Sequence, residues 1–306
     1  MTTFRQSQIV RNLALRAEII RAIREFFQEN EFLEVETPLR IPAPAPEPHI
    51  HACPADNWYL HTSPELCMKR LLAAGYPKIF QICKCFRQKE RGRRHLEEFT
   101  MLEWYESGIT YNELMAQTGA LIDFVRRRVG LGNVIPYQGR RITLSQSWPK
   151  ITVAAAFEQY GSMDMKAALA ADRFEEVLAF DIEPHLGIDR PVFLHDYPAA
   201  FNTLAALIPG RSDLSQRFEL YMGGVEICNG FTELTDAAEQ RRRFIQESDA
   251  MEKTGQIAYP LPERFLQDLA FMPPAAGNAL GIDRLAMIFC DKAAIDDVVA
   301  FTPEEL

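Results

Sequence analysis

The segment 217–234 restricts the fold of this chain more than any other, because two alternating runs of residues flank the pair Gly223-Gly224. Two adjacent glycines adopt the positive backbone angles that a two-residue hairpin turn requires. We therefore predict a β-hairpin in which Met222 faces Val225. A hairpin of this kind belongs in a sheet with antiparallel strands.

This hairpin would place two carboxylates on one face. In the predicted register Tyr221 faces Glu226, and alternation brings Glu219 to the same side. The two carboxylates then lie diagonally, roughly 7–8 Å apart. Such a pair suits magnesium ions on a triphosphate, because magnesium keeps its waters and uses few protein ligands. Two solvated glutamates are the commoner alternative.

Three further residues of the segment, Asn229, Phe231 and Glu233, alternate together. By simple parity they face away from Glu226. All of them can belong to one site only if the strand shifts phase, and Gly230 is a natural place for a β-bulge.

The other elements alternate in type and differ in length. Helices are predicted over 9–29 and 111–129, and another begins at Ser63-Pro64-Glu65 and runs to Gly75. Strands are predicted over 32–38, 78–87 and 99–105, a proline-rich loop over 41–48, a mixture of short elements over 130–215, and a strand entering an apolar helix over 277–289. This order predicts an α+β fold with a mainly antiparallel sheet flanked by helices.

The charge balance bears on possible partners. The net charge is −9 and the pI about 5.3. Proteins held to nucleic acid by phosphate contacts usually carry a basic face, so we expect no large RNA footprint. Residues 1–20 lack the apolar stretch of a signal peptide, and no apolar run is long enough to cross a membrane. We expect a cytoplasmic protein.

The six cysteines show no spacing typical of a zinc site. Cys83 and Cys85 are two residues apart in a predicted strand, so they point the same way. That separation is too short for a usual zinc knuckle. We expect reduced and mostly buried thiols.

The strand 99–105 places Phe99, Met101, Glu103 and Tyr105 on one face. A carboxylate among aromatic rings fits either a solvated sheet edge or a pocket for a cation.

A basic loop follows the strand 78–87, and its cationic side chains are Lys89, Arg91, Arg93, Arg94 and His95. Together with Arg87 the loop could hold a polyphosphate, because guanidinium forks match phosphate oxygens. It could also guide an acceptor molecule or be an ordinary solvated turn. Near the end of the chain, Gly281 would let the backbone approach a flat ligand, and Arg284 at a helix start could meet another phosphate.

Together these segments resemble the three signature motifs of class II aminoacyl-tRNA synthetases, in the lysine-specific branch. The long helix and the strand ending at Pro38 resemble motif 1, which builds a dimer interface in that family. Residues 86–103 resemble motif 2, and 277–284 resemble motif 3. The hairpin 217–234 is similar to the lysyl enzymes almost residue for residue. The resemblance implies a class II catalytic core over 1–306.

The resemblance also implies roles for matching residues. Arg87 and Arg284 would be catalytic residues, with Arg87 holding the α-phosphate of ATP and Arg284 holding the far end of the triphosphate. The residues implied at ATP are Arg87, Lys89, Glu90, His95, Phe99, Glu219, Glu226, Gly281 and Arg284, with Mg²⁺ on Glu219 and Glu226. Those implied at the amino acid are Ser63, Glu65, Glu103, Tyr105, Asn229, Phe231, Glu233 and Ala279. A buried ammonium needs opposing carboxylates, which gives the second set its physical reason.

Two features point to one subgroup. Motif 1 begins near residue 1, which leaves no room for the anticodon-binding domain that precedes it in lysyl-tRNA synthetases. Ala279 stands where those enzymes have glycine. Both features resemble the elongation factor P lysine ligase family, which attaches lysine or (R)-β-lysine to a lysine of elongation factor P. The resemblance implies a homodimer and makes tRNA an unexpected substrate.

Two rival functions stay open at this point, a truncated lysyl-tRNA synthetase and a non-catalytic regulatory relative. Motif 2 also departs from its usual pattern. Lys89 occupies a position that is usually glutamate, and Glu90 follows it. The usual His-Asn-Pro-Glu reads His95-Leu96-Glu97-Glu98 here.

Overall fold

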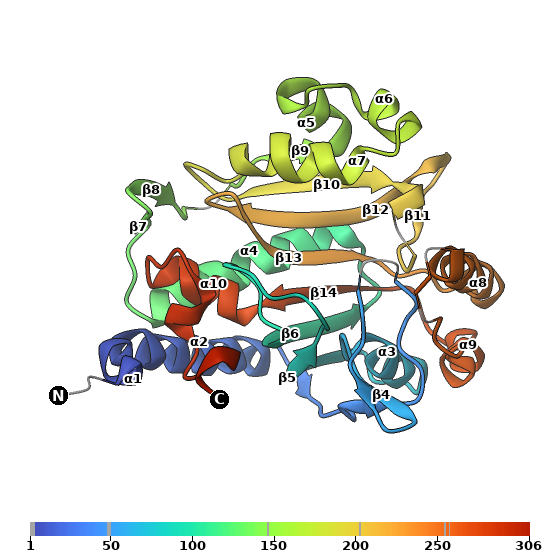
Figure 1. Ribbon diagram of the computed structural model, residues 1–306, viewed down its shortest axis with the longest axis horizontal. Coiled ribbons are helices and arrows are strands. Elements are labelled where there is room, and N and C mark those ends of the chain that lie inside the picture. Colours follow the sequence, from blue (N-terminus) through green and yellow to red (C-terminus); the bar gives the residue numbers. More distant parts are fainter. Residues whose placement is uncertain (1–3, 48–49, 146, 202, 254, 257) are drawn as a thin grey trace.

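The computed structural model describes residues 4–47, 50–145, 147–201, 203–253, 255–256 and 258–306. A nine-stranded sheet forms its centre (Figure 1). Its order is β1 (Leu33–Glu34), β5 (Lys78–Phe86), β6 (Glu98–Ser107), β14 (Ala275–Gly281), β13 (Val225–Thr232), β12 (Arg211–Met222), β10 (Val192–Pro198) and β9 (Lys150–Thr152), and β11 (Leu207–Ile208) pairs with β12. Among these described strands only β1–β5 and β10–β9 pair in parallel. A mainly antiparallel sheet flanked by helices is therefore confirmed.

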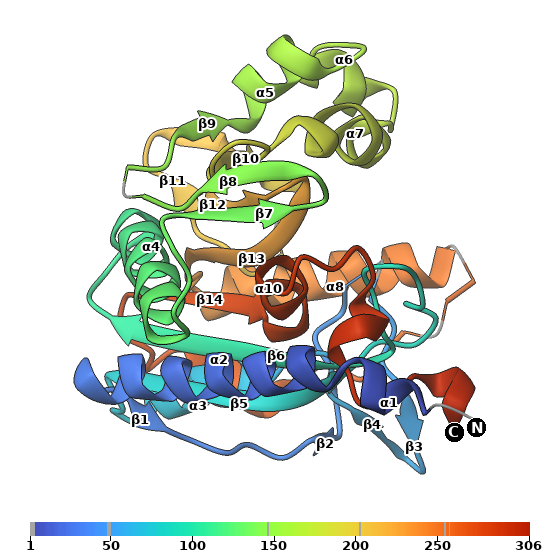
Figure 2. The same ribbon diagram turned by 90° about the vertical axis from the view of Figure 1, so that its left-hand side faces the viewer.

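Three helices build the largest apolar core with the middle of this sheet: α2 (Val10–Glu29), α4 (Tyr111–Arg128) and α10 (Ile282–Phe289). Figure 2 shows α2 lying along the end of the molecule that carries β5 and β6. Phe27 of α2 stacks on Phe80 of β5 with ring centroids 4.7 Å apart. The amphipathic helix predicted over 9–29 thus exists because its apolar face is buried against the sheet.

Two smaller helical groups flank the sheet. The first is α3 (Glu65–Ala73), α8 (Ala237–Lys253) and α9 (Glu263–Leu269), which share an apolar cluster. The second is α5 (Val153–Tyr160), α6 (Met165–Ala170) and α7 (Phe174–Val177), which pack beyond β10 (Figure 1). The shorter elements are α1 (Arg5–Gln8), the small sheet β2 (Arg40–Ile41), β4 (Trp58–Leu60) and β3 (Pro54–Ala55), and the hairpin β7 (Val134–Tyr137) and β8 (Arg140–Thr143).

The hairpin β12–β13 has the predicted turn and the predicted register at its tip. Met222 faces Val225 and Tyr221 faces Glu226. The register then shifts, so that Leu220 faces Cys228. The expected phase shift is therefore real, but it lies beside the turn and not at Gly230.

Gly230 serves packing instead. A Cβ there would come within 2.8 Å of the Phe218 ring, so only glycine lets that ring lie against the strand. Because of the earlier shift, Asn229 faces Glu219. Asn229 and the residues that alternate with it therefore lie on the same face of the sheet as Glu219 and Glu226, although simple alternation predicts opposite faces.

The strand predicted over 32–38 is shorter than expected. Pairing is confined to Leu33–Glu34, and one further backbone bond joins Val35 N to Phe80 O at 2.9 Å. Thr37 N donates to the Gln81 side chain, not to a strand, which ends the ladder. Leu33 is 50% exposed at this edge of the sheet.

The proline-rich stretch 42–47 is irregular as predicted, and Pro48 lies outside the described residues. Among the residues that the structure covers, no helix is both long and apolar enough to cross a membrane.

Candidate active site

A cavity of about 440 Å³ opens on the face of the sheet formed by β6, β12, β13 and β14. The predicted site residues that line it are Arg87, Glu90, His95, Phe99, Glu219, Glu226, Asn229, Phe231, Ala279, Gly281 and Arg284. Six other predicted residues do not line it: Ser63, Glu65, Lys89, Glu103, Tyr105 and Glu233. Of these six, Lys89 is exposed on the loop, and the other five are buried or partly buried without being part of the cavity wall.

Glu103 is a buried carboxylate behind that wall. Only 1% of it is exposed, and it accepts hydrogen bonds from Ser63 Oγ at 2.8 Å and Tyr105 Oη at 2.6 Å. Burial, and next the charge of Glu65, raises the pKa of Glu103 well above its usual range. No cation pairs with it within the described part of the chain. A carboxylate in such a place is stable as an anion only beside a positive charge, so the position favours a cationic ligand.

A second buried carboxylate group shares an internal cation. Lys69 of α3 is 1% exposed, and its Nζ lies 2.5 Å from Glu65 Oε1 and 2.5 Å from Glu233 Oε2. The same ammonium lies 5.1 Å from the centroid of the Phe231 ring. Burial alone would lower the pKa of Lys69, but the two glutamates raise it above its ordinary value. The lysine therefore stays charged and holds both carboxylates in place.

We call Glu65, Lys69, Glu103 and Glu233 the carboxylate cluster. The backbone of β14 presses against it. A Cβ on Gly277 would lie 2.1 Å from the Tyr105 ring and 2.7 Å from Glu233 Oε1, so glycine is required for this close approach. Ala279, two residues on, faces Glu103 across the strand pair and lines the cavity. Ala279 therefore forms the wall between the cavity and the cluster.

The other side of the cavity carries arginines. The Arg87 guanidinium lies 5.1 Å from the centroid of the Phe99 ring, and its Nη1 is 3.8 Å from Glu90 Oε2. Arg87 Nε is buried and donates to no atom of the described residues. An arginine with spare donors in a cavity is suited to an anion such as phosphate.

Arg284 bridges the strand β13 and the loop. Its Nη1 pairs with Glu226 Oε2 at 2.9 Å, and its Nη2 lies 2.5 Å from His95 Nε2. Because the guanidinium can only donate, His95 accepts at Nε2 and is neutral. Removal from water, and next the charge of Arg284, lowers the pKa of His95 to about 4.

Glu219 is saturated with donors. Arg217 Nη2 lies 2.6 Å from its Oε1, and the hydroxyls of Tyr197 and Tyr221 donate to its Oε2 at 2.6 and 2.7 Å. Among the described residues Glu226 pairs through Oε2 only, so its Oε1 keeps acceptor capacity. We call Arg87, Arg217, Glu219, Glu226 and Arg284 the arginine cluster.

Glu183 is a third carboxylate near this cluster. Burial, followed by the charges of Glu219 and Glu226, raises its pKa to about 7. Tyr221 Oη lies 3.2 Å from its Oε1. Carboxylate oxygens of Glu183 and Glu226 are ligands of the kind that magnesium prefers, whereas both oxygens of Glu219 already accept hydrogen bonds.

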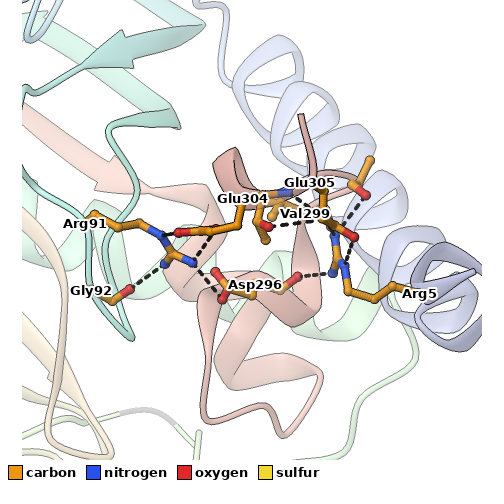
Figure 3. A network of polar contacts seen from close by, with 9 residues as sticks. Arg5, Arg91, Gly92, Asp296, Val299, Glu304 and Glu305 are labelled. Carbon is orange, nitrogen blue, oxygen red and sulfur yellow. Dashed lines mark hydrogen bonds and ion pairs between the residues drawn. The ribbon is translucent and has the colours of Figure 1, made fainter.

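The basic loop is anchored to the end of the chain. Arg91 pairs with Glu304 and Asp296 at 2.9 Å each, and Arg5 pairs with Glu305 at 2.7 Å (Figure 3). Arg94 donates to the carbonyl of Gly224 at 2.7 Å, in the hairpin turn. These contacts tether the loop to the C-terminal segment and to the hairpin turn, while Arg91 and Arg94 stay exposed to solvent.

The structure shows where the residues that depart from the usual motif 2 pattern lie in the loop. Lys89 takes a positive φ of 66°, its backbone N–H donates to Glu97 Oε1 at 2.6 Å, and the residue is exposed and does not line the cavity. Glu90 lines the cavity beside Arg87. Leu96 is buried in the same wall.

Several residues of the site were not singled out from the sequence. They are Glu47, Lys69, Glu183 and Arg217. The pairing of Lys69 with Glu65 could have been predicted, because the two residues are four apart on a predicted helix and therefore lie on the same side of it. Arg217 could also have been predicted, because it shares the strand face of Glu219. Glu47 and Glu183 lie in irregular or short elements whose position sequence periodicity does not reveal.

Comparison with known proteins agrees with this geometry. Residues 1–305 match the family of class II tRNA synthetases (D, K and N). The chain is 38% identical to the elongation factor P–(R)-β-lysine ligase of Pectobacterium carotovorum, over 99% of this chain and 98% of that protein. The corresponding ligase of Enterobacter sp. is 36% identical, over 98% and 97%. The lysine–tRNA ligase of Carboxydothermus hydrogenoformans is 36% identical, over 94% of this chain but only 64% of that protein. The chain belongs to the class II tRNA synthetase family (D, K and N) and, within it, to the family of elongation factor P–(R)-β-lysine ligases.

Proposed function

We propose that this protein uses ATP to activate (R)-β-lysine or lysine as an adenylate and transfers it to a lysine side chain of elongation factor P. The observation that carries the proposal is Glu103, a buried carboxylate without a cationic partner among the described residues, next to a cavity whose opposite side carries arginines. A cationic amino acid and an anionic nucleotide fit these two sides.

The first step joins the amino acid to AMP. The substrate carboxylate attacks the α-phosphorus of ATP, and pyrophosphate leaves with the bonding electrons of the broken P–O bond. Arg87, through its spare donors, stabilises the charge on the α-phosphate, and Phe99 offers its ring to adenine. Arg284 and neutral His95 receive the far phosphates, next to Gly281, which also lines the cavity.

The carboxylate cluster and its neighbours select the amino acid. Glu103 with Tyr105 binds the distal ammonium, and Glu65, whose backbone N–H donates to Ser63 Oγ, lies toward the other amino group. Glu233 acts through Lys69, and Asn229 and Phe231 complete the cavity wall. A site that pairs a buried ammonium with carboxylates discriminates strongly against uncharged side chains.

Magnesium would be held by Glu226 and Glu183, and by Glu219 once one of its present donors gives way, and it would supply neutralising charge for the triphosphate. In the second step the deprotonated amine of the acceptor lysine attacks the carbonyl carbon of the mixed anhydride. AMP leaves, an amide forms, and the amine loses a proton.

We also propose that residues 1–306 form one catalytic domain and that two copies associate. The continuous nine-stranded sheet supports a single domain. The dimer is supported by apolar side chains that are exposed near α2 and β1, namely Val10, Leu33 and Leu39. Sedimentation velocity over a range of concentrations tests the dimer, and a single monomeric species at all of them would contradict it.

The central test has two stages. ATP–pyrophosphate exchange is measured with (R)-β-lysine, L-lysine and L-leucine, and exchange is expected with the two lysine isomers only. Radiolabelled amino acid is then offered with elongation factor P or with lysine tRNA. Label is expected on elongation factor P and not on its variant lacking the acceptor lysine. Efficient charging of tRNA would overturn the proposal that elongation factor P is the acceptor. Absence of any ATP–pyrophosphate exchange would favour a non-catalytic role.

A further inference from the structure

A compact group of soft ligands lies outside the machinery described so far. It consists of His61, which follows β4, and Cys83 and Cys85 of β5. His61 Nε2 lies 3.9 Å from each sulfur, and the two sulfurs lie 3.9 Å from each other. The sulfur of Met101 lies 3.9 Å from Cys85 Sγ.

These separations are those of a metal site. The point equidistant from three atoms spaced in this way lies about 2.25 Å from each, close to the Zn–S distance of about 2.3 Å. The Zn–N distance is about 2.0–2.1 Å, so His61 would need to approach by only about 0.2 Å. We infer that His61, Cys83 and Cys85 form a binding site for one thiophilic divalent ion of the Zn²⁺ or Cd²⁺ type, with the fourth position open to water or to Met101.

The ligands are held in place before any metal arrives. His61 N donates to Leu39 O at 2.8 Å, and His61 O accepts from Phe86 N at 3.0 Å. Cys83 and Cys85 face Met101 and Phe99 in the β5–β6 ladder. Binding therefore costs little conformational entropy, which favours affinity.

The protonation states are suited to a cation. A hydrogen bond from Cys85 lowers the pKa of Cys83 to about 6. His61 Nε2 lies 2.7 Å from the carbonyl oxygen of Lys84, to which it donates in the metal-free chain. Coordination through Nε2 needs the tautomer with hydrogen on Nδ1 and gives up that one hydrogen bond.

The charge balance links the site to the cavity. A divalent ion bound by His61, Cys83 and Cys85 places positive charge next to the cavity. Met101, which faces Cys83 across the strand pair, is part of the cavity wall. If the proposed function holds, a loaded site weakens the attraction for the cationic amino acid and raises its KM.

A Cd²⁺ titration tests whether these residues bind a metal ion, and it does not depend on enzyme activity. Chelator-treated protein is titrated with Cd²⁺, and the thiolate-to-metal ultraviolet absorption is followed together with heat release. One equivalent is expected to bind, with at least ten-fold weaker binding in Cys83→Ser and unchanged binding in Cys67→Ser, whose thiol lies elsewhere. His61→Gln, checked for folding by its melting curve, should show the same loss.

Three results would overturn the inference: no thiolate absorption at one equivalent, equal affinity in Cys83→Ser, or equal loss in Cys67→Ser. In amino-acid-dependent exchange, the KM for (R)-β-lysine should rise at least three-fold in metal-loaded wild type and not in Cys83→Ser. An unchanged KM would overturn the charge coupling to the cavity, whatever the outcome for binding.

Discussion

The two sides of the cavity treat buried negative charge in opposite ways. The carboxylate cluster contains three glutamates but one cation, Lys69. In the arginine cluster each of the two glutamates has its own arginine, Arg217 on Glu219 and Arg284 on Glu226. Arg87 adds a third positive charge there. The first side is short of cations and the second is not.

This difference assigns the ligands. Buried like charges are tolerated only when a partner arrives, so the carboxylate cluster favours a substrate with ammonium groups. The arginine cluster fits an anion, and we expect a metal ion to join only when phosphate oxygens complete its coordination. Substitutions that equalise the two sides should therefore damage one ligand and spare the other.

The largest effect is expected from Glu103→Gln. It leaves the substrate ammonium buried without its counter-charge, a loss of about 3–5 kcal/mol or at least about a hundred-fold in kcat/KM for the amino acid. Exchange assays should show this loss while the KM for ATP changes by less than about two-fold. Glu106→Gln, on the same strand but paired with Lys78 at 3.0 Å, is the matched control. Equal losses in both variants would show that Glu103 serves the fold and not the substrate.

Lys69→Met should destabilise the empty protein. It removes the cation shared by Glu65 and Glu233 and leaves two buried carboxylates unpaired, which costs about 3–5 kcal/mol of unfolding free energy. Urea unfolding measures this. Lys78→Met breaks a more exposed pair and should cost no more than about 1 kcal/mol. Adding Glu233→Gln to Lys69→Met should restore part of the loss, and strict additivity would argue against the shared-cation arrangement.

Sequence patterns predicted the elements of this site better than its contacts. The helices over 9–29 and 111–129 and the β12–β13 turn follow from periodicity and from Gly223-Gly224. Alternation correctly put Glu103 and Tyr105 on one face, because the period of a strand is fixed by its geometry.

The remaining errors have physical causes. The register of β13 shifts beside the turn, at a position where no residue type predicts a β-bulge. The sequence predicts the bulge at Gly230, but that glycine is required by the packing of the Phe218 ring. The pairing of Lys69 with Glu233, and the meeting of His61 with two cysteines, join segments far apart in the chain. Sequence spacing carries no information about such contacts.

A pH effect should separate the two sides. The pKa of Glu183, beside the arginine cluster, is raised to about 7 in the folded protein. The folded state therefore holds more protons than the unfolded state between about pH 4.5 and 7. Its contribution to stability is complete below about pH 4.5 and is lost as pH rises through 7.

Glu183→Gln removes that titration. From pH 5 to 8 the unfolding free energy of wild type should fall by about 1–3 kcal/mol relative to the variant, measured by urea unfolding at each pH. Saturating Mg-ATP should reduce the difference, because the bound cation stabilises the carboxylate. Parallel curves for both proteins would show that Glu183 is not held near the other carboxylates in solution.

The smallest effect concerns the wall between cavity and cluster. Ala279 faces Glu103 on one neighbouring strand and Asn229 on the other, and its methyl group lines the cavity. Removing one methyl changes discrimination by about 1–3 kcal/mol at most, so Ala279→Gly should shift the kcat/KM ratio toward L-lysine and away from (R)-β-lysine by about ten-fold. Ala276→Gly, on the opposite face of β14, removes an equal methyl from the apolar core and should lower stability without moving the ratio. If both variants keep the wild-type ratio, the position of the amino group is read by the carboxylates alone, and the wall takes no part in the choice.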